Sequence, residues 1–272
     1  MSELRLENIT VRFGSRRTGL TAVDAVDLTV PSGHVVGLVG ESGSGKSTLA
    51  RAAVGLTPLT GGQVLLDGQP VAQSRSARRG RRPLQMVFQD PYSSLDPRMT
   101  AGDSIAEAIP RGTPRGAARR AETARLIELV GLPGGAIDAY PARLSGGQRQ
   151  RVALARALAG QPDVIIADEI TSALDVSTQG AVLNVVRGLQ RQLRLSMLFI
   201  SHNLAVVRYV ADIVAVMYHG RIVECGQADE VLANPRHSYT RELLSAVPEP
   251  GTRLDATTDL ADLPDLPDLD QE

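Results

Sequence analysis

Cysteine is nearly absent from this 272-residue chain. The single residue, Cys225, excludes a disulfide framework, and no Cys/His spacing resembles a zinc site. No apolar run approaches the ~18 residues that a membrane helix needs, and the charged start Met1–Glu7 has no apolar signal region. A net charge of −1 gives no global attraction to nucleic acid. We therefore expect a soluble cytoplasmic protein that reaches a membrane only through partner subunits.

Lysine is the second scarce residue type, because Lys46 is the only lysine among 29 Lys and Arg residues. A lysine ammonium is a compact point charge on a flexible stem, whereas an arginine guanidinium is a bulky planar fork. The one lysine that this arginine-rich chain retains is therefore predicted to have a chemical role. A hydrophobic content of 43% is enough for a core in one large domain or two small ones.

Lys46 lies in a stretch that fits the phosphate-binding pattern G-x-x-x-x-G-K-[ST], from Gly40 to Ser47. An apolar run precedes it and a plausible helix follows it, which disfavours a chance glycine-rich turn. Such a loop turns backbone N–H groups toward phosphates, and the helix adds its positive N-terminal end. We predict that Lys46 reaches the β- and γ-phosphates of a nucleotide and that the Ser47 hydroxyl ligates Mg²⁺. The other nucleotide-binding residues predicted in this stretch are Gly40, Glu41, Ser42, Gly43, Ser44, Gly45 and Thr48.

Hydrophobic patterning predicts the rest of the fold. Alternation at 4–13 and 22–30 indicates a small antiparallel sheet before the nucleotide core. Further strands are predicted at 35–39, 63–68, 84–88, 163–169, 196–201 and 213–218, with a short one through 223. Helices are predicted at 47–55, 117–130 and 149–159. Strands that alternate with helices imply an α/β fold with a parallel sheet and active groups at the carboxyl ends of its strands.

Several charged segments are predicted to be solvated. The arginines at 75–82 lack interleaved aromatics, which favours a solvated loop over a nucleic-acid or lipid patch. Arg119, Arg120 and Arg125 are expected on the wet face of the 117–130 helix. The acidic, low-complexity segment 251–272 is interpreted as a disordered tail.

Three side chains at predicted strand ends could complete a nucleotide site. Asp168 would hold Mg²⁺ directly or through water, and Glu169 would polarise the attacking water. His202 could hydrogen-bond the γ-phosphate, although a lone histidine is usually structural. Phe13 lies on a strand shortly before the phosphate loop, where it could stack on adenine or pack in the core; its position favours stacking.

These residues, taken in order, resemble the ATPase subunit of ATP-binding cassette (ABC) transporters over about residues 4–248. The resemblance rests on 40–47, Gln89, Leu144-Ser145-Gly146-Gly147-Gln148, Asp168-Glu169, Ser172-Ala173-Leu174-Asp175 and His202. It implies a P-loop NTPase with an antiparallel β subdomain and an inserted helical subdomain at about 96–160. It also implies two facing cassettes with ATP and Mg²⁺ at their interface, in which Ser145, Gly146, Gly147 and Gln148 contribute to nucleotide binding. Gln89 would contact Mg²⁺ or the attacking water, and Asp175 would lie across the dimer seam.

A narrower resemblance, to the dipeptide/oligopeptide/nickel importer ATPases, rests on 85–100 and 234–248. It implies pairing with a second, non-identical ATPase, two membrane permease subunits and an extracytoplasmic solute-binding protein, and so a place at the cytoplasmic face of the membrane. Short peptides are the expected solute, with nickel or another small solute as the alternative. The implied division is a cassette at 1–233, an importer-type segment at 234–250 and the tail.

Three positions depart from the family pattern. Ile170 stands where proline is usual, Asn203 follows His202 where an acid is common, and Cys225 alone cannot build the iron–sulfur centre of some relatives. The changes at Ile170 and Asn203 put the tuning of ATP turnover in question.

Other classes of ABC ATPase agree less well with this sequence. DNA-repair enzymes insert coiled coils or zinc modules between the two halves of the site, translation factors carry two cassettes, and exporters do not share the 234–248 segment.

Overall fold

The computed structural model describes residues 2–14, 19–71, 82–90, 94–110, 112 and 116–245. Four features of the sequence lie wholly or partly outside these residues. They are the arginine-rich loop at 75–82, Tyr92 and Ser93 of the importer-type stretch, the end of the importer-type C-terminal segment, and the acidic tail.

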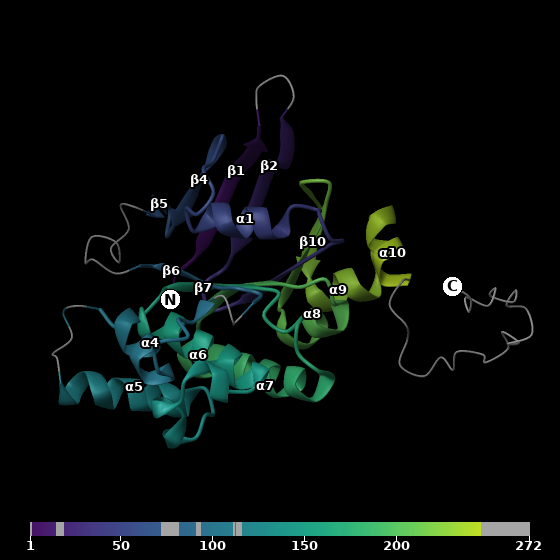
Figure 1. Cartoon of the computed structure of the whole chain (residues 1–272). Coiled ribbons are helices and arrows are strands. Elements are labelled where there is room, and N and C mark those ends of the chain that lie inside the picture. The colour runs from purple at the N-terminus through teal and green to yellow at the C-terminus, as the bar shows by residue number, and fades with distance from the viewer. Residues whose placement is uncertain are drawn as a thin grey trace, which may run out of the picture.

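Two sheets organise the described chain (Figure 1). The main sheet has the strand order β10-β9-β3-β8-β7-β6, in which neighbours from β9 to β6 are parallel and β10 pairs antiparallel with β9. Its strands are β3 (Val35–Val39), β6 (Leu84–Val87), β7 (Val164–Asp168), β8 (Ser196–Ile200), β9 (Ile213–Tyr218) and β10 (Arg221–Gln227). The predicted parallel α/β sheet is confirmed.

A second sheet, antiparallel, has the order β2-β1-β4-β5. Its strands are β1 (Leu4–Phe13), β2 (Leu20–Val30), β4 (Gly61–Leu66) and β5 (Gln69–Pro70). The predicted pairing of the first two strands is confirmed, and β4 extends the sheet by pairing with β1. Helix α1 (Lys46–Ala53) packs between the two sheets, where Leu49 and Ala50 share a core with β1, β2 and one face of the main sheet.

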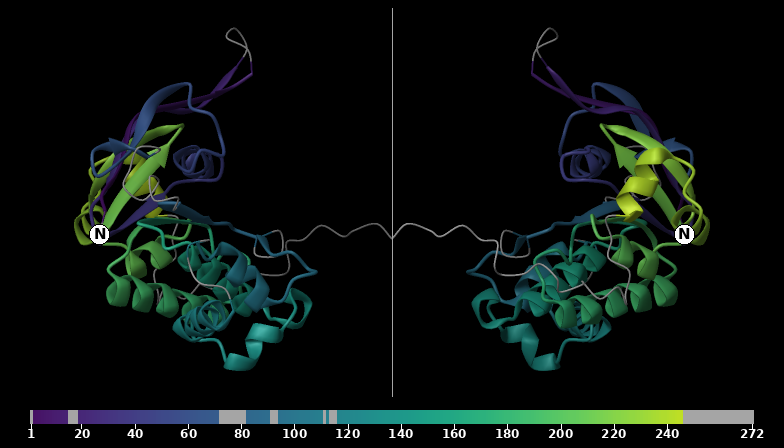
Figure 2. Two further views of the ribbon diagram at one scale, coloured as in Figure 1. Left: turned by 90° about the vertical axis from the view of Figure 1, so that its left-hand side faces the viewer. Right: turned by 90° about the vertical axis from the view of Figure 1, so that its right-hand side faces the viewer.

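The other face of the main sheet is covered by helices, as the side views show (Figure 2). These are α6 (Gly146–Ala159), α7 (Val176–Leu193) and α8 (Leu204–Val210), and α4 (Ala101–Ala108) and α5 (Ala117–Leu129) pack on α6. Two 3₁₀ turns, Gly134–Asp138 and Pro141–Arg143, connect α5 to α6. In β3, Val36 and Leu38 face α1 while Val35 and Val39 face the helical side. Burial on both faces explains why the strand is continuously apolar.

Two local expectations are corrected. Helix α6 begins at Gly146 rather than Arg149, because Ser145 is its N-cap and forms a capping box with Gln148. Arg119 is not on the wet face of α5. Its guanidinium is half-buried and donates to the Ala106 carbonyl at 2.7 Å, at the end of α4, where helix carbonyls lack partners of their own.

The chain after β10 returns toward the phosphate loop. It forms α9 (Ala228–Ala233) and α10 (Ser238–Ser245), and α10 lies beside β10 (Figure 1). Among the described residues, no helix combines the length and apolar content that a bilayer crossing requires.

Candidate nucleotide site

The phosphate loop connects β3 to α1 at the carboxyl edge of the main sheet. Three of its glycines have positive φ, and its shape depends most on Gly40 (+148°) and Gly45 (+109°). A Cβ on Gly40 would lie 2.1 Å from the Met217 carbonyl oxygen, and one on Gly45 would lie 2.4 Å from the Ala22 carbonyl oxygen. Both positions therefore require glycine for conformation and for space.

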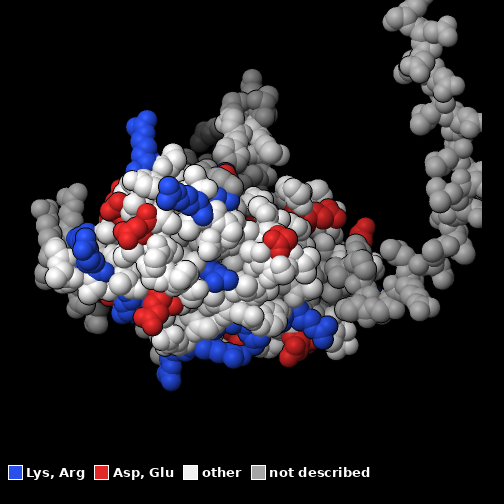
Figure 3. All heavy atoms as spheres, turned by 60° about the horizontal axis from the view of Figure 1, so that its bottom comes forward, with Lys and Arg blue, Asp and Glu red and all other residues white. Residues whose placement is uncertain are grey.

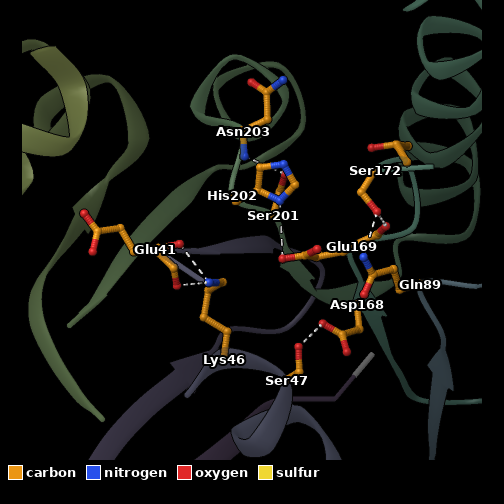
Figure 4. Close-up of polar contacts among 12 residues, drawn as sticks. Glu41, Lys46, Ser47, Gln89, Asp168, Glu169, Ser172, Ser201, His202 and Asn203 are labelled. Atoms are coloured by element: carbon orange, nitrogen blue, oxygen red, sulfur yellow. Dashed lines mark hydrogen bonds and ion pairs between the residues drawn. The ribbon is translucent and has the colours of Figure 1, made fainter. Parts of the chain in front are cut away.

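Lys46 is 4% exposed, and carbonyl oxygens of its own loop hold its ammonium. Its Nζ donates to the carbonyl oxygens of Gly40 and Glu41, each at 2.7 Å (Figure 4). Burial lowers the pKa of Lys46 from its usual range, and the carboxylates of Glu169, Asp168 and Glu41 oppose that shift. The ammonium is thus placed inside the loop, at the carboxyl edge of the main sheet.

Ser47 and Asp168 form the second contact of the site. The Ser47 hydroxyl donates to Asp168 Oδ1 at 3.0 Å, which joins the first turn of α1 to the end of β7 (Figure 4). Asp168 is 3% exposed, and burial raises the pKa of its carboxyl, with the Ser47 hydrogen bond acting in the opposite direction.

A hydroxyl beside a buried carboxylate fits Mg²⁺, because that cation binds through one or two protein oxygens while keeping water and phosphate ligands. The described residues contain no group of three or more His, Cys, Asp or Glu side chains that would form a protein-only metal cage. The geometry therefore suits a cation that arrives with a nucleotide.

Glu169 follows Asp168 at the end of β7 and has an unusual backbone. Its φ is +48°, a left-handed conformation that non-glycine residues seldom adopt. The turned backbone stays anchored, since the Glu169 N–H donates to the Ile200 carbonyl oxygen at 3.0 Å. On the far side, His202 Nδ1 lies 3.4 Å from Glu169 Oε1 (Figure 4).

Gln89 also reaches this cluster, after β6. Its Nε2 donates to Ser172 Oγ at 3.2 Å, and Ser172 Oγ donates to the Glu169 carbonyl oxygen at 2.9 Å (Figure 4). The sequence analysis included Ser172 in the family resemblance but assigned it no function. No local sequence pattern could predict its hydrogen bond to Gln89, which lies 83 positions away.

The other predicted residues lie apart from this cluster. Phe13 ends β1 and is 49% exposed, so the alternative that it packs in the core is wrong, and stacking on adenine stays a prediction. Ser145 and Gln148 cap α6, with Gln148 Oε1 accepting from the Ser145 N–H at 2.8 Å. Gly147 packs against α7, where an added Cβ would lie 2.3 Å from Thr178 Cγ2. This glycine is therefore needed for helix packing.

The two departures next to the site have structural explanations. Asn203 is the N-cap of α8, and its side-chain oxygen accepts from the Ala205 N–H at 3.0 Å. Asparagine and aspartate cap helices about equally well, so this change preserves the local fold. Ile170 is 1% exposed and belongs to the core of the helical side, so its side chain contributes packing that the smaller proline would lack.

Comparison with known proteins agrees with this geometry. Residues 23–172 match the family described as ABC transporter, and residues 223–270 match the family described as oligopeptide/dipeptide transporter, C-terminal region. A putative peptide import ATP-binding protein from Brucella ovis is 47% identical over 250 residues, covering 91% of this chain and 79% of the relative. The oligopeptide transport ATP-binding protein OppF of Lactococcus lactis is 48% identical, covering 87% and 75%.

Comparison with solved structures shows that this chain has the fold of ABC cassettes. The ATP-binding cassette MJ0796, a dimer in a post-hydrolysis state with ADP and Pi, superposes with a TM-score of 0.72 at 28% identity, covering 83% of this chain and 98% of that one. CbiO1 from Clostridium perfringens, part of the ABC transporter complex cbiONQ, gives a TM-score of 0.74 at 28% identity, covering 85% and 90%. This chain therefore belongs to the ABC transporter ATP-binding proteins of the oligopeptide/dipeptide (Opp) family and is an ABC-type ATPase.

Proposed function

We propose that this ATPase powers the import of short peptides through a membrane complex. The observation that carries the proposal is the match of residues 223–270 to the oligopeptide/dipeptide C-terminal region, which lies outside the part matched to ABC transporters in general. Relatives that cover most of this chain are described as peptide or oligopeptide transport proteins, which supports the same solute class.

In the proposed mechanism, Lys46 leaves the Gly40 and Glu41 carbonyls for the β- and γ-phosphates of ATP. Ser47 and Asp168 would hold Mg²⁺, which would neutralise charge on the phosphates when bound. Glu169 takes a proton from the attacking water, and His202 orients the Glu169 carboxylate and donates toward the γ-phosphate. Gln89, held by Ser172, positions the same water through its amide.

Two cassettes would face each other in the working complex. Ser145, Gly146, Gly147 and Gln148 then bind the nucleotide of the opposite chain, since the N-terminus of α6 attracts anions. Phe13 stacks on the adenine of the chain's own nucleotide. Asp175 lies at the seam between the cassettes.

The remaining partners follow from the same proposal. They are a second, non-identical cassette, two permease subunits and an extracytoplasmic binding protein, so the chain lies at the cytoplasmic face of the membrane. Within the chain, residues 1–233 form the cassette, with its helical subdomain at about 96–160, and 234–250 form the importer-type segment before the tail.

The test is to co-express the chain with its neighbouring transporter subunits, reconstitute the complex in lipid and measure phosphate release. Binding protein loaded with di- to pentapeptides should stimulate hydrolysis, because solute and nucleotide sites are coupled in free energy. Stimulation by nickel chelates or sugars and not by peptides would overturn the solute class. The same complex carrying Glu169→Gln is the matched control, which separates coupled hydrolysis from contaminating phosphatase.

A further inference from the structure

The outer side of the phosphate loop is covered by the C-terminal part of the chain. The Glu41 N–H donates to the Tyr239 hydroxyl oxygen at 2.9 Å, across 198 residues of sequence. Tyr239 is 5% exposed, and its ring packs on Tyr218 with the centroids 4.0 Å apart. Next to this contact, the Gly220 N–H donates to the Ser44 carbonyl oxygen at 2.9 Å. Two late segments thus hold the loop from outside.

Tyr239 is itself fixed by β10. The Glu224 carboxylate accepts from the N–H groups of Arg236 at 2.8 Å and His237 at 3.0 Å, just before α10. Burial acts to raise the pKa of Glu224, but these hydrogen bonds, together with the Thr240 side chain and the charge of His237, lower it. The Tyr239 N–H then donates to His237 Nδ1 at 3.2 Å. The hydroxyl is therefore placed by a hydrogen-bonded segment that begins on the main sheet.

Glu41 connects this contact to the phosphate-binding lysine. Its N–H is held by Tyr239, and its carbonyl oxygen accepts from Lys46 Nζ at 2.7 Å. We propose that Tyr239 is a positioning residue of the nucleotide site, whose hydroxyl fixes the Glu41 peptide and keeps the phosphate loop in its binding conformation. When the loop is already in its binding conformation, less of the binding free energy is used to order it. When that conformation is less populated, the affinity for nucleotide falls in the same proportion.

Tyr239→Phe tests the proposal, because it keeps the ring and its packing and removes only the hydroxyl that accepts from the Glu41 N–H. Loss of one hydrogen bond should raise the dissociation constant for MgATP, and its KM, by about two- to tenfold. The kcat should stay within about twofold of the wild-type value, since Glu169 and His202 are untouched. Hydrogen exchange at the Glu41 amide should speed up in the nucleotide-free protein.

Tyr209→Phe is the matched control. The Tyr209 hydroxyl donates to Asn184 Oδ1 between α8 and α7, so this variant also loses one tyrosine hydrogen bond. It should leave nucleotide affinity and Glu41 exchange unchanged. An unchanged dissociation constant and KM in Tyr239→Phe would overturn the proposal even if the melting temperature fell, because a purely structural role predicts lower stability without a change in affinity.

Discussion

At the scale of a single residue, Glu169, the proposed activator of water, has a strained backbone. Its left-handed φ of +48° is costly for a side chain with a Cβ, and such outliers concentrate at functional sites. The flanking hydrogen bond to Ile200 and the buried side chain of Ile170 maintain that geometry. The position of the carboxylate at the sheet edge is therefore imposed by the fold around it.

We expect Glu169→Gln to bind MgATP normally and to hydrolyse it about 10²–10⁴-fold more slowly, because the amide cannot accept the proton of water. Steady-state phosphate release and equilibrium binding of a fluorescent ATP analogue measure the two quantities. Glu122→Gln, which changes a partly exposed acid that is ion-paired with Arg125 on α5, is the control and should hydrolyse at the wild-type rate. Turnover of Glu169→Gln within tenfold of wild type would exclude Glu169 as the base.

Sequence alone identified the side chains of the central cluster, since Lys46, Ser47, Asp168, Glu169 and His202 all follow apolar strands or a phosphate-loop pattern. It missed the hydrogen bonds that orient them. Ser172 and Tyr239 act on residues 83 and 198 positions away, and such contacts leave no periodic or local signal. Asn203 was predictable, because an asparagine directly before an apolar helical turn fits the rule for N-caps.

At the scale of secondary-structure elements, the contact between α6 and α7 depends on the absence of a side chain at Gly147. We expect Gly147→Ala to lower the free energy of unfolding by about 1–3 kcal/mol, because its methyl would overlap Thr178 Cγ2. Thr178→Ser removes that methyl and keeps the hydroxyl that bonds Asp175 Oδ2. The double variant should therefore recover most of the loss in urea unfolding.

Gly188→Ala serves as the control for that experiment. Gly188 lies inside α7, and an added Cβ would meet no atom within 4 Å, so alanine there should stabilise the protein by about 1 kcal/mol. If the double variant at 147 and 178 were no more stable than Gly147→Ala, the contact would not be the cause of the loss.

The N-cap of α7 gives a prediction of pH dependence. Hydrogen bonds from the Ser177 hydroxyl and from the Thr178 N–H and hydroxyl lower the pKa of Asp175 from 3.8 to about 2. Because the folded pKa lies below the unfolded one, the carboxylate stabilises the folded state above about pH 4, and that contribution is lost as the pH falls toward 2.

The stability advantage of wild type over Asp175→Asn should therefore shrink as the pH is lowered from 6 to 2.5. Urea unfolding of both proteins at several pH values provides the measurement, and differences between the two cancel the effects of other titrating groups. An advantage that stayed constant with pH would contradict the assignment.

The predicted boundaries of the strands agree with the structure where every residue of the strand is buried. β3, β7 and β9 agree with the prediction to within a residue or two because a strand buried on both faces is apolar throughout. The start of α6 was missed because glycine, which occupies its first two positions, has a low helix propensity. Ser145 and Gln148 nevertheless fit the S-x-x-Q capping box, and this local pattern outweighs glycine propensity.

At the scale of the whole molecule, the described surface of the helical side carries charge of both signs. On the face formed by the helical side, acidic and basic side chains alternate over the described surface (Figure 3). Among the described residues in this view, the basic side chains do not form the continuous patch that is typical of a surface for nucleic-acid binding.

Pairing of two cassettes can be tested on the purified chain. With MgATP, Glu169→Gln should elute at twice the 28.9 kDa mass of the monomer, because trapped nucleotide holds the interface closed. Lys46→Ala, which cannot bind the phosphates, should remain a monomer. If Glu169→Gln dimerises only when mixed with the neighbouring cassette, the working pair is non-identical; if neither sample dimerises, the two-cassette arrangement is wrong.

The strand order also determines when the nucleotide site can assemble on the ribosome. β3 is made early, but its two neighbours in the sheet are β8 and β9, which begin at Ser196 and Ile213. At 5–20 residues per second, the strand waits roughly 10–30 s for its first partner. Through that interval an apolar segment is exposed on the nascent chain, where nascent-chain chaperones can bind it. Tyr239 emerges later still, so newly made protein should acquire full affinity for ATP only at the end of translation.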